Sequence, residues 1–339
     1  MSPLNGLTRR DFLKLTGAGL FGLFLAELRV DAALAASNRQ GRATFSGVPV
    51  YDEPAFSAKQ LTLLGKDAVV DIQFPTIGEG TYNRVWYRLA GGFTYSGWLQ
   101  PVKTIPQMPQ TKLARPRTLG EVTVPFLDTR RAASIKSKRS MRLYYGSTHW
   151  VTDVTVNQDD DSVWYQIYDK VLRQHFYVNA AEMRLVPDSE LARLSPDVPD
   201  ALKSLHVDLA TQTVTAFEGE KLVLHSRCAS GVKGTRTPLG DYQTYHKGPS
   251  IHMTNQGDDE LSIYDLPGVP WVSFFTGLGH AFHGTYWHND FGKPRSHGCV
   301  NLPNSAAKFL YRWTSPTVPP ETDYLHKPKV GTAVHIISS

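Results

Sequence analysis

A cysteine and two histidines near the end of the chain have types and spacing suited to nucleophilic catalysis. Cys299 lies in the stretch Arg295-Ser296-His297-Gly298-Cys299-Val300-Asn301, sixteen positions after His283. A thiol nucleophile needs a base within hydrogen-bond reach and a group that orients the base. Glycine favours a turn here, so we expect Cys299 to be exposed on a turn. The alternative is that Cys299 is an ordinary buried cysteine, because free cysteines usually behave as small hydrophobic side chains.

These residues resemble the signature of a known enzyme family. His283, followed after twelve residues by Ser296-His297-Gly298-Cys299-Val300-Asn301, is similar to the motif of L,D-transpeptidases, the YkuD-type cysteine enzymes of bacterial cell-wall synthesis. The interval between the histidine and the motif is on the short side for the family, and the resemblance covers residues 202–338. It implies a β-rich catalytic domain with no metal or organic cofactor.

The resemblance also implies a role for each residue of the motif. Cys299 would be the nucleophile and His283 its base, with the backbone carbonyl of Gly284 orienting the ring and fixing its tautomer. Backbone N–H groups of the turn would form the oxyanion hole, and further side chains would line the substrate site. The oxyanion donors would be His297, Gly298 and Cys299, and the substrate-binding residues Trp287, Ser296 and Asn301. Trp287 could instead belong to the core, and Asn301 could only fasten a turn.

Two other arrangements of the same side chains need to be weighed. His297 is the rival base, because a spacing of two residues in a strand would place it on the same face as Cys299. A zinc site is the other, since His280, His283, His288, His297 and Cys299 are close in the sequence. Their spacing matches no standard zinc pattern. We therefore take His283 as the base and expect no metal, and we expect Cys228 to be a buried strand residue.

Composition places the chain among globular proteins. It has 339 residues, of which 41% are apolar and 20% charged, enough for two or three domains. The formal net charge of +5 suits an anionic surface such as a cell wall or a membrane. Lysine and arginine are scattered and no nucleic-acid-reading motif is present, so we expect no nucleic-acid partner. Two cysteines exclude a disulfide-rich scaffold.

The N-terminal residues 1–36 are similar to a twin-arginine export signal. Thr8-Arg9-Arg10-Asp11-Phe12 is followed by an apolar run from Leu15 to Ala26 and by the small residues Ala33-Leu34-Ala35. The run is short of the roughly 20 residues that span a bilayer. We therefore expect export to the periplasm or cell wall with only transient membrane contact; an uncleaved anchor is the alternative.

An aromatic pattern recurs between residues 43 and 187. Trp86-Tyr87-Arg88-Leu89 and Trp164-Tyr165-Gln166-Ile167 are 78 residues apart, and aromatic and polar residues alternate around both. Such alternation between turn residues predicts short antiparallel strands. Residues 43–104 resemble a bacterial SH3-like barrel, and 118–187 resemble one more loosely. The aromatic side chains could line a groove for cell-wall peptides or simply fill a small core. The proline-rich stretch 100–118 is typical of a linker.

The region 202–338 carries its own strand and helix signals. Residues 204–209 and 213–217 predict a hairpin, and 221–227 a further strand. Residues 269–279 could wall a pocket or form a buried strand. Ala306, Phe309, Leu310 and Trp313 form one apolar face of a helix that begins after Pro303. Its N-terminus would favour a thiolate at Cys299. We expect a mainly β chain: two small SH3-like β-barrels, then a β-sandwich with a short helix after the nucleophile motif.

The expected function follows from the resemblance. The enzyme would join a donor and an acceptor stem peptide of peptidoglycan in a 3→3 cross-link through a Cys299 thioester. Two alternatives remain open: an L,D-carboxypeptidase, in which water resolves the thioester, and a non-catalytic peptidoglycan-binding protein. The motif does not distinguish diaminopimelate from lysine in the stem.

Overall fold

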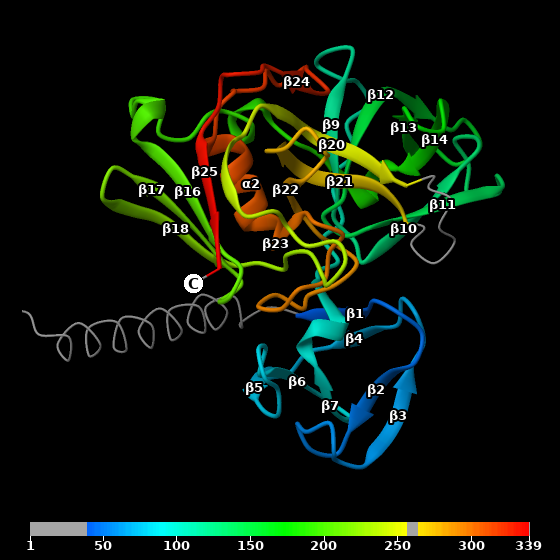
Figure 1. Cartoon of the computed structure of the whole chain (residues 1–339). Helices are drawn as coiled ribbons and strands as arrows, with labels where there is room; N and C mark the ends of the chain where they lie inside the picture. Colours follow the sequence, from blue (N-terminus) through cyan, green and yellow to red (C-terminus); the bar gives the residue numbers. More distant parts are fainter. Residues whose placement is uncertain (1–38, 256–263, 339) are drawn as a thin grey trace, which may run out of the picture.

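The computed structural model describes residues 39–255 and 264–338, and strands dominate it (Figure 1). Helix α2 (Asn304–Trp313) is the one α-helix of these residues, so the mainly β prediction is confirmed. None of the described helices is long and apolar enough to cross a membrane. The predicted export signal, 1–36, lies outside the described residues.

The first unit forms two sheets, drawn in blue and cyan at the bottom of Figure 1. The strand orders are β4-β1-β8 and β3-β2-β7-β6-β5. Trp86 is fully buried and packs against Tyr51, Phe56, Tyr95 and Trp98 with ring centroids 4.9–6.5 Å apart. Here the aromatic residues fill a core. The elements are β1 (Gln40–Ala43), β2 (Val48–Tyr51), β3 (Gln60–Leu64), β4 (Val69–Asp71), β5 (Phe74–Ile77), β6 (Val85–Leu89), β7 (Gly92–Tyr95), the 3₁₀ turn η2 (Ser96–Trp98) and β8 (Leu99–Val102).

The second unit is one seven-stranded sheet with the order β11-β10-β14-β13-β12-β9-β15. Trp164 is buried in it, as Trp86 is in the first unit. The proline-rich stretch 100–118, which precedes this sheet, is not a free linker. The Ile105 and Gln107 N–H groups donate to the backbone carbonyls of Thr123 and Ala181. The elements are β9 (Thr118–Val122), β10 (Phe126–Arg130), β11 (Arg139–Tyr144), β12 (Thr148–Val156), β13 (Val163–Asp169), β14 (Gln174–Asn179), η3 (Ala180–Glu182) and β15 (Met183–Leu185).

The sequence repeat corresponds to a shared succession of elements in these two units. In the first, the hairpin β6-β7 leads through η2 into β8, which pairs with the first strand, β1. In the second, β13-β14 leads through η3 into β15, which pairs with β9. The two tryptophans therefore occupy the same strand of the repeated succession.

Two five-stranded sheets enclose helix α2 in the rest of the chain (Figure 1). Their orders are β18-β17-β16-β25-β19 and β23-β22-β21-β20-β24. The predicted hairpin is confirmed by β16 and β17, and residues 269–274 belong to a strand whose Trp271 is buried. The elements are β16 (Lys203–Asp208), β17 (Thr213–Glu218), β18 (Lys221–Arg227), β19 (Gly240–Gln243), β20 (His246–Thr254), β21 (Asp265–Phe274), β22 (Ala281–Gly284), β23 (Val300–Leu302), β24 (Leu325–His326) and β25 (Ala333–Ile337). The 3₁₀ turns η4 (Asp188–Glu190) and η5 (Asp200–Leu202) lie before the first of these strands.

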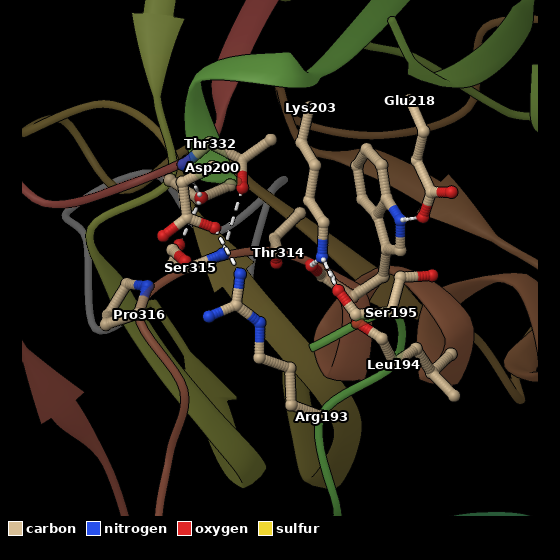
Figure 2. A network of polar contacts seen from close by, with 12 residues as sticks. Arg193, Leu194, Ser195, Asp200, Lys203, Glu218, Thr314, Ser315, Pro316 and Thr332 are labelled. Atoms are coloured by element: carbon tan, nitrogen blue, oxygen red, sulfur yellow. Dashed lines mark hydrogen bonds and ion pairs between the residues drawn. The ribbon is translucent and has the colours of Figure 1, made fainter. Parts of the chain in front are cut away.

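Two buried lysines hold the C-terminal end of helix α2. Lys247 Nζ donates to the carbonyls of Tyr311, Thr314 and Pro316 at 2.5–2.9 Å. Lys203 Nζ donates to Trp313 O at 3.2 Å and to the loop carbonyls that Figure 2 shows beside it. The last carbonyls of a helix have no partner within the helix, so donors from outside it satisfy them. These bonds fix α2 behind the sheet that carries β22 and β23.

The buried residue Arg42 joins the first unit to the loop that follows β22. Its guanidinium donates to Tyr286 O at 2.6 Å and pairs with Asp67 at 2.6 Å. Tyr95 of the same unit donates its hydroxyl to Asp290 at 2.8 Å. A buried charge is tolerated only when it is paired and hydrogen-bonded. The loop 285–290 is therefore held from outside the two sheets by the first unit.

Candidate active site

The site is built on two neighbouring parallel strands. In β22 and β23, Phe282 pairs with Val300 and His283 with Asn301, and Cys299 directly precedes β23. Phe282, Val300 and Leu302 contribute to the core around α2. Because side chains alternate along a strand, His283 projects from the opposite face. Cys299 lies two residues before Asn301, the strand partner of His283, which puts the Cα atoms of His283 and Cys299 about 8 Å apart.

The surroundings of Cys299 confirm that it lies on the face opposite the helix. Its side chain packs against the buried cluster of Val269, Val272 and Ala281, which Phe274 and Trp287 also border, and Cys299 is partly exposed. Sγ lies 3.8 Å from Gly279 O. Burial raises the pKa of the Cys299 thiol to about 11, although a backbone hydrogen bond from Ala281 lowers it in part. The thiol is therefore neutral at neutral pH.

His283 is buried and also neutral. Its Nδ1 lies 3.0 Å from Gly284 O. Since a carbonyl only accepts hydrogen bonds, Nδ1 carries the proton and Nε2 is left as the acceptor. Burial lowers the pKa of His283 to about 4, against a smaller opposite effect of the Gly284 hydrogen bond. The pair at rest is a neutral thiol and a neutral imidazole with a free basic nitrogen.

The prediction that the helix N-terminus favours a thiolate at Cys299 is wrong for this structure. Helix α2 begins at Asn304, beyond the whole of β23, and three strand residues span about 10 Å. The Asn304 side chain instead donates to Gly146 O at 3.1 Å, in the second unit. The helix therefore begins at the far end of β23, and burial dominates the pKa of the thiol.

Ser296 and Gly298 shape the turn before Cys299. The buried Ser296 hydroxyl donates to Cys299 O at 2.5 Å and accepts from the Gly298 N–H at 3.1 Å. Thr237 donates to Gly298 O at 2.8 Å. Gly298 has φ +116°, and a Cβ there would lie 2.5 Å from the His280 ring, so only glycine fits. Of the three expected oxyanion donors, the Gly298 N–H is thus bonded within the turn.

His297 is exposed, and the spacing argument for it as the rival base is wrong. Residues 297–299 form a bend with a positive φ at Gly298, so the alternation of a strand does not apply to them. The His297 ring lies beside Tyr264, with centroids 5.6 Å apart.

Trp287 and Asn301 both lie next to His283. The Trp287 and His283 ring centroids are 5.7 Å apart, and Trp287 also packs in the cluster that contains Cys299. Asn301 is buried, and its side-chain amide lies 2.9 Å from the ring of His288. Burial lowers the pKa of His288 to about 3, which leaves that ring uncharged too.

On sequence alone, His280 is only a candidate zinc ligand. Its Nδ1 lies 2.8 Å from Thr276 Oγ1, which also accepts from the His280 N–H at 3.1 Å. A hydroxyl that accepts this bond can give its own proton to Nδ1, which makes Nε2 a donor. The same ring edge touches Gly298. The contact of His280 with the turn is visible only in the structure. Its position in the sequence, three residues before His283, does not predict that contact.

The clustered histidines do not form a metal centre in the part of the chain that the structure describes. No group of three or more His, Cys, Asp or Glu side chains there is placed to hold a metal ion. His283, His288 and His280 instead each have a hydrogen-bond partner: a carbonyl, an amide and a hydroxyl.

Comparison with known proteins identifies the C-terminal region. Residues 203–336 match the family model of the L,D-transpeptidase catalytic domain, YkuD. No curated protein sequence matches the chain.

Several solved structures are similar to part of this chain. An L,D-transpeptidase from Stackebrandtia nassauensis is 23% identical over 44% of this chain and 64% of its own, with a TM-score of 0.30. L,D-transpeptidase 1 from Mycobacterium tuberculosis is 17% identical over 40% of this chain and 62% of its own, with a TM-score of 0.31. The catalytic domain of the E. faecium L,D-transpeptidase is 24% identical over 40% and 96%, with a TM-score of 0.32. The chain thus spans less than two thirds of the first two of these proteins.

Proposed function

Because residues 203–336 match the family model of the L,D-transpeptidase catalytic domain, we propose that the chain acts on peptidoglycan stem peptides with Cys299 as its nucleophile. One observation carries the proposal. A partly exposed thiol and an imidazole with a free basic nitrogen stand on the same face of two paired strands. The Gly284 carbonyl fixes the tautomer in which His283 can accept the thiol proton.

Acylation proceeds by general-base catalysis. The Cys299 sulfur attacks the carbonyl carbon at the L-centre of the third residue of a donor stem while His283 Nε2 takes the thiol proton. Because both groups begin neutral, the proton moves during the attack. The tetrahedral oxyanion would face the His297 and Cys299 N–H groups, since the Gly298 N–H donates to Ser296. When it collapses, the C–N bond breaks, His283 returns the proton to the leaving amine of D-alanine, and a thioester remains.

The second half of the reaction repeats these roles. The side-chain amine of an acceptor stem attacks the thioester carbonyl and gives a proton to His283. The C–S bond breaks, the sulfur recovers the proton, and a 3→3 cross-link is released. Water in place of the amine would yield an L,D-carboxypeptidase, which the same site can support chemically.

The remaining parts of the proposal concern the place of action. Residues 1–36 act as a twin-arginine signal that brings the folded enzyme to the periplasm or cell wall, where its positive charge suits an anionic polymer. The two N-terminal units act as SH3-like modules that hold the enzyme at its substrate. Replacement of Arg9 and Arg10 by lysine should retain the protein in the cytoplasm. Equal export of that variant would contradict this part.

Intact-mass measurement tests the enzyme assignment directly. The protein is incubated with a tetrapeptide stem or with imipenem, with and without an acceptor amine. We expect one acyl adduct on the unaltered chain, its absence in Cys299→Ala, and a cross-linked product only when the amine is present. A hydrolysed stem with no cross-link would favour the carboxypeptidase. Absence of any adduct would favour a binding protein.

A further inference from the structure

A row of aromatic rings crosses the sheet on the same face as Cys299. Ala281 of β22 pairs with Phe274, Phe274 with His246, and His246 with His326, so one residue from each strand stands in line. The rings of Phe274 and His246 are stacked with centroids 4.8 Å apart, and those of His246 and His326 are 5.5 Å apart. Ala281, Phe274 and Cys299 share one cluster, so the row begins beside the thiol.

Phe274 and His246 of this row line a cavity of about 410 Å³ between the sheet and the second unit. We call it the edge pocket, because it lies at the edge of the catalytic sheet, along β20 beyond its short pairing with β24. Cavities of this size are typical of small-molecule sites. Its aromatic lining comes from both sides, and the residues are Phe274, His246 and Tyr324 from the catalytic region and Trp150 and Tyr168 from the second unit.

Tyr324 presents much of its ring to solvent at this pocket. It is 56% exposed, although its ring also contacts His246 at 5.4 Å between centroids and Lys170 at 5.2 Å. Exposed aromatic rings that converge with polar side chains fit a ligand that is itself both apolar and polar. A pyranose ring has that character, with C–H groups on its faces and hydroxyls at its rim.

The charged side chains around the edge pocket neutralise one another. Asp323 forms ion pairs with Arg117 and Lys170. Asp169 and Asp265 both bond the ring of His252, and their contacts raise its pKa against the effect of burial. Among the described lining residues, each acid thus has a basic partner. A ligand with free carboxylates would find no unpaired cation there. A neutral ligand needs no such partner.

The separation of the pocket from Cys299 matches the length of a stem. Three strand spacings between Cys299 and His246 amount to about 14 Å. Three residues of an extended stem, from the attacked carbonyl back to the sugar, span about 10–11 Å. The ring that carries the stem would follow at that distance. Remote groups of a substrate contribute binding energy without touching the reacting atoms.

We propose that the edge pocket binds an N-acetylated amino-sugar ring of the glycan strand to which the donor stem is attached. This rests on the proposed function, since the stem must lie at Cys299 for its sugar to reach the pocket. The enzyme would therefore prefer stems on glycan to free stem peptides, and the preference would come mainly from KM.

Two donors that differ only in the sugar test this inference. The full chain is assayed with a free tetrapeptide and with the same tetrapeptide on its disaccharide, and kcat and KM are measured for each. We expect about a tenfold higher kcat/KM for the disaccharide donor. In Tyr324→Ala the ratio should fall to about one, and in the matched control Tyr324→Phe, which keeps the ring, it should persist. Tyr168→Ala tests the opposite wall and should also lower the ratio.

The failures of the two proposals are distinguishable. Equal kcat/KM values for the two donors in the unaltered chain, or an unchanged ratio in both alanine variants, would overturn the glycan inference and leave the enzyme assignment standing. If the unaltered chain forms no adduct with imipenem or with either donor, the proposed function fails. Titration of the free disaccharide into the chain, followed by NMR, then decides the pocket alone. Shifts lost in Tyr324→Ala support it, and absence of shifts in the unaltered chain overturns it.

Discussion

Cys228 and Cys299 are the two free cysteines of the chain, and they differ in burial and in access for a substrate. Cys228 is fully buried in the core between the two five-stranded sheets, among aliphatic and aromatic side chains. Cys299 lies partly exposed on the other face of one of those sheets, beside Trp287 and on the same face as His283. Burial raises the pKa of both thiols, further for Cys228.

A low thiol pKa therefore does not distinguish Cys299 from Cys228. Both thiols are neutral at rest, so neither is a ready thiolate. Cys299 differs from Cys228 in being partly exposed, so a substrate can reach it. It also has the neutral imidazole of His283 on its face of the sheet, and the Gly284 bond uses Nδ1 and leaves Nε2 available. In the proposed mechanism, Cys299 therefore becomes reactive only during the attack, by proton transfer to His283.

The largest expected effect concerns which sulfur reacts. Cys299→Ala should lose all acylation by imipenem, because no other nucleophile takes its place, whereas Cys228→Ala should react at an unchanged rate. Intact mass with peptide mapping checks both. An adduct mapped to Cys228, or one that survives in Cys299→Ala, would reverse the comparison.

Removal of the base should have the next largest effect. General-base catalysis contributes about 10²–10⁴-fold, so His283→Gln should lower the acylation rate constant by that order. His297→Gln is the matched control, because His297 is exposed on the bend and contacts Tyr264 instead. Stopped-flow acylation measures both variants. A larger loss in His297→Gln than in His283→Gln would show that the base has been assigned to the wrong histidine.

The neutral resting state predicts slow alkylation of Cys299. With a thiol pKa of about 11, the thiolate fraction at pH 7.4 is about 10²-fold below that of a free cysteine of pKa ~8.5. Iodoacetamide labelling should therefore be slow at neutral pH and rise towards pH 11, since a raised pKa delays ionisation. His283, with a pKa of about 4, stays uncharged over this range. A labelling rate that reaches its plateau near pH 6–7 would indicate a thiolate–imidazolium pair instead.

His280 should contribute a smaller, more specific effect through the turn that carries Cys299. Its ring contacts Gly298, and Thr276 fixes its orientation. The lost ring N–H lies beside the turn whose N–H groups are proposed to face the oxyanion, so His280→Ala should lower the acylation rate by at least about tenfold. Glutamine retains an N–H donor, so His280→Gln should recover part of the rate. Equal losses in kcat for both variants, or an effect on KM alone, would exclude this role.

The sequence predicts the local elements well because their signals are local. The hairpin over 204–217, the strand 221–227 and the helix after Pro303 all follow from the alternation or the period of apolar residues, and the structure confirms them. The repeat around Trp86 and Trp164 is also predicted from a local pattern, the alternation of aromatic and polar residues. The predicted start of α2 is confirmed, but the predicted direction of its N-terminus relative to Cys299 is wrong.

The site itself needed long-range information. The motif places Cys299 on a turn, but only the parallel pairing of β22 with β23 decides which face it shares with His283. The raised pKa of the thiol depends on packing, and packing by residues distant in the sequence leaves no periodic trace. The link from Arg42 to Tyr286, across 244 positions, is of the same kind. The spacing argument for His297 failed because one positive φ, at Gly298, interrupts the strand.

The smallest expected effect on the reaction comes from the inert thiol. Cys228 sits in a closed apolar core, and Cys228→Ser would bury a hydroxyl there, which costs about 1–3 kcal/mol of unfolding free energy unless the hydroxyl finds a partner. Cys228→Ala removes only the sulfur and should cost less. Denaturant unfolding measures both, and the acylation rate of the folded fraction should match that of the unaltered chain. A drop in that rate at unchanged stability would mean that the core behind β23 tunes Cys299 through the sheet, and the two cysteines would then no longer be independent.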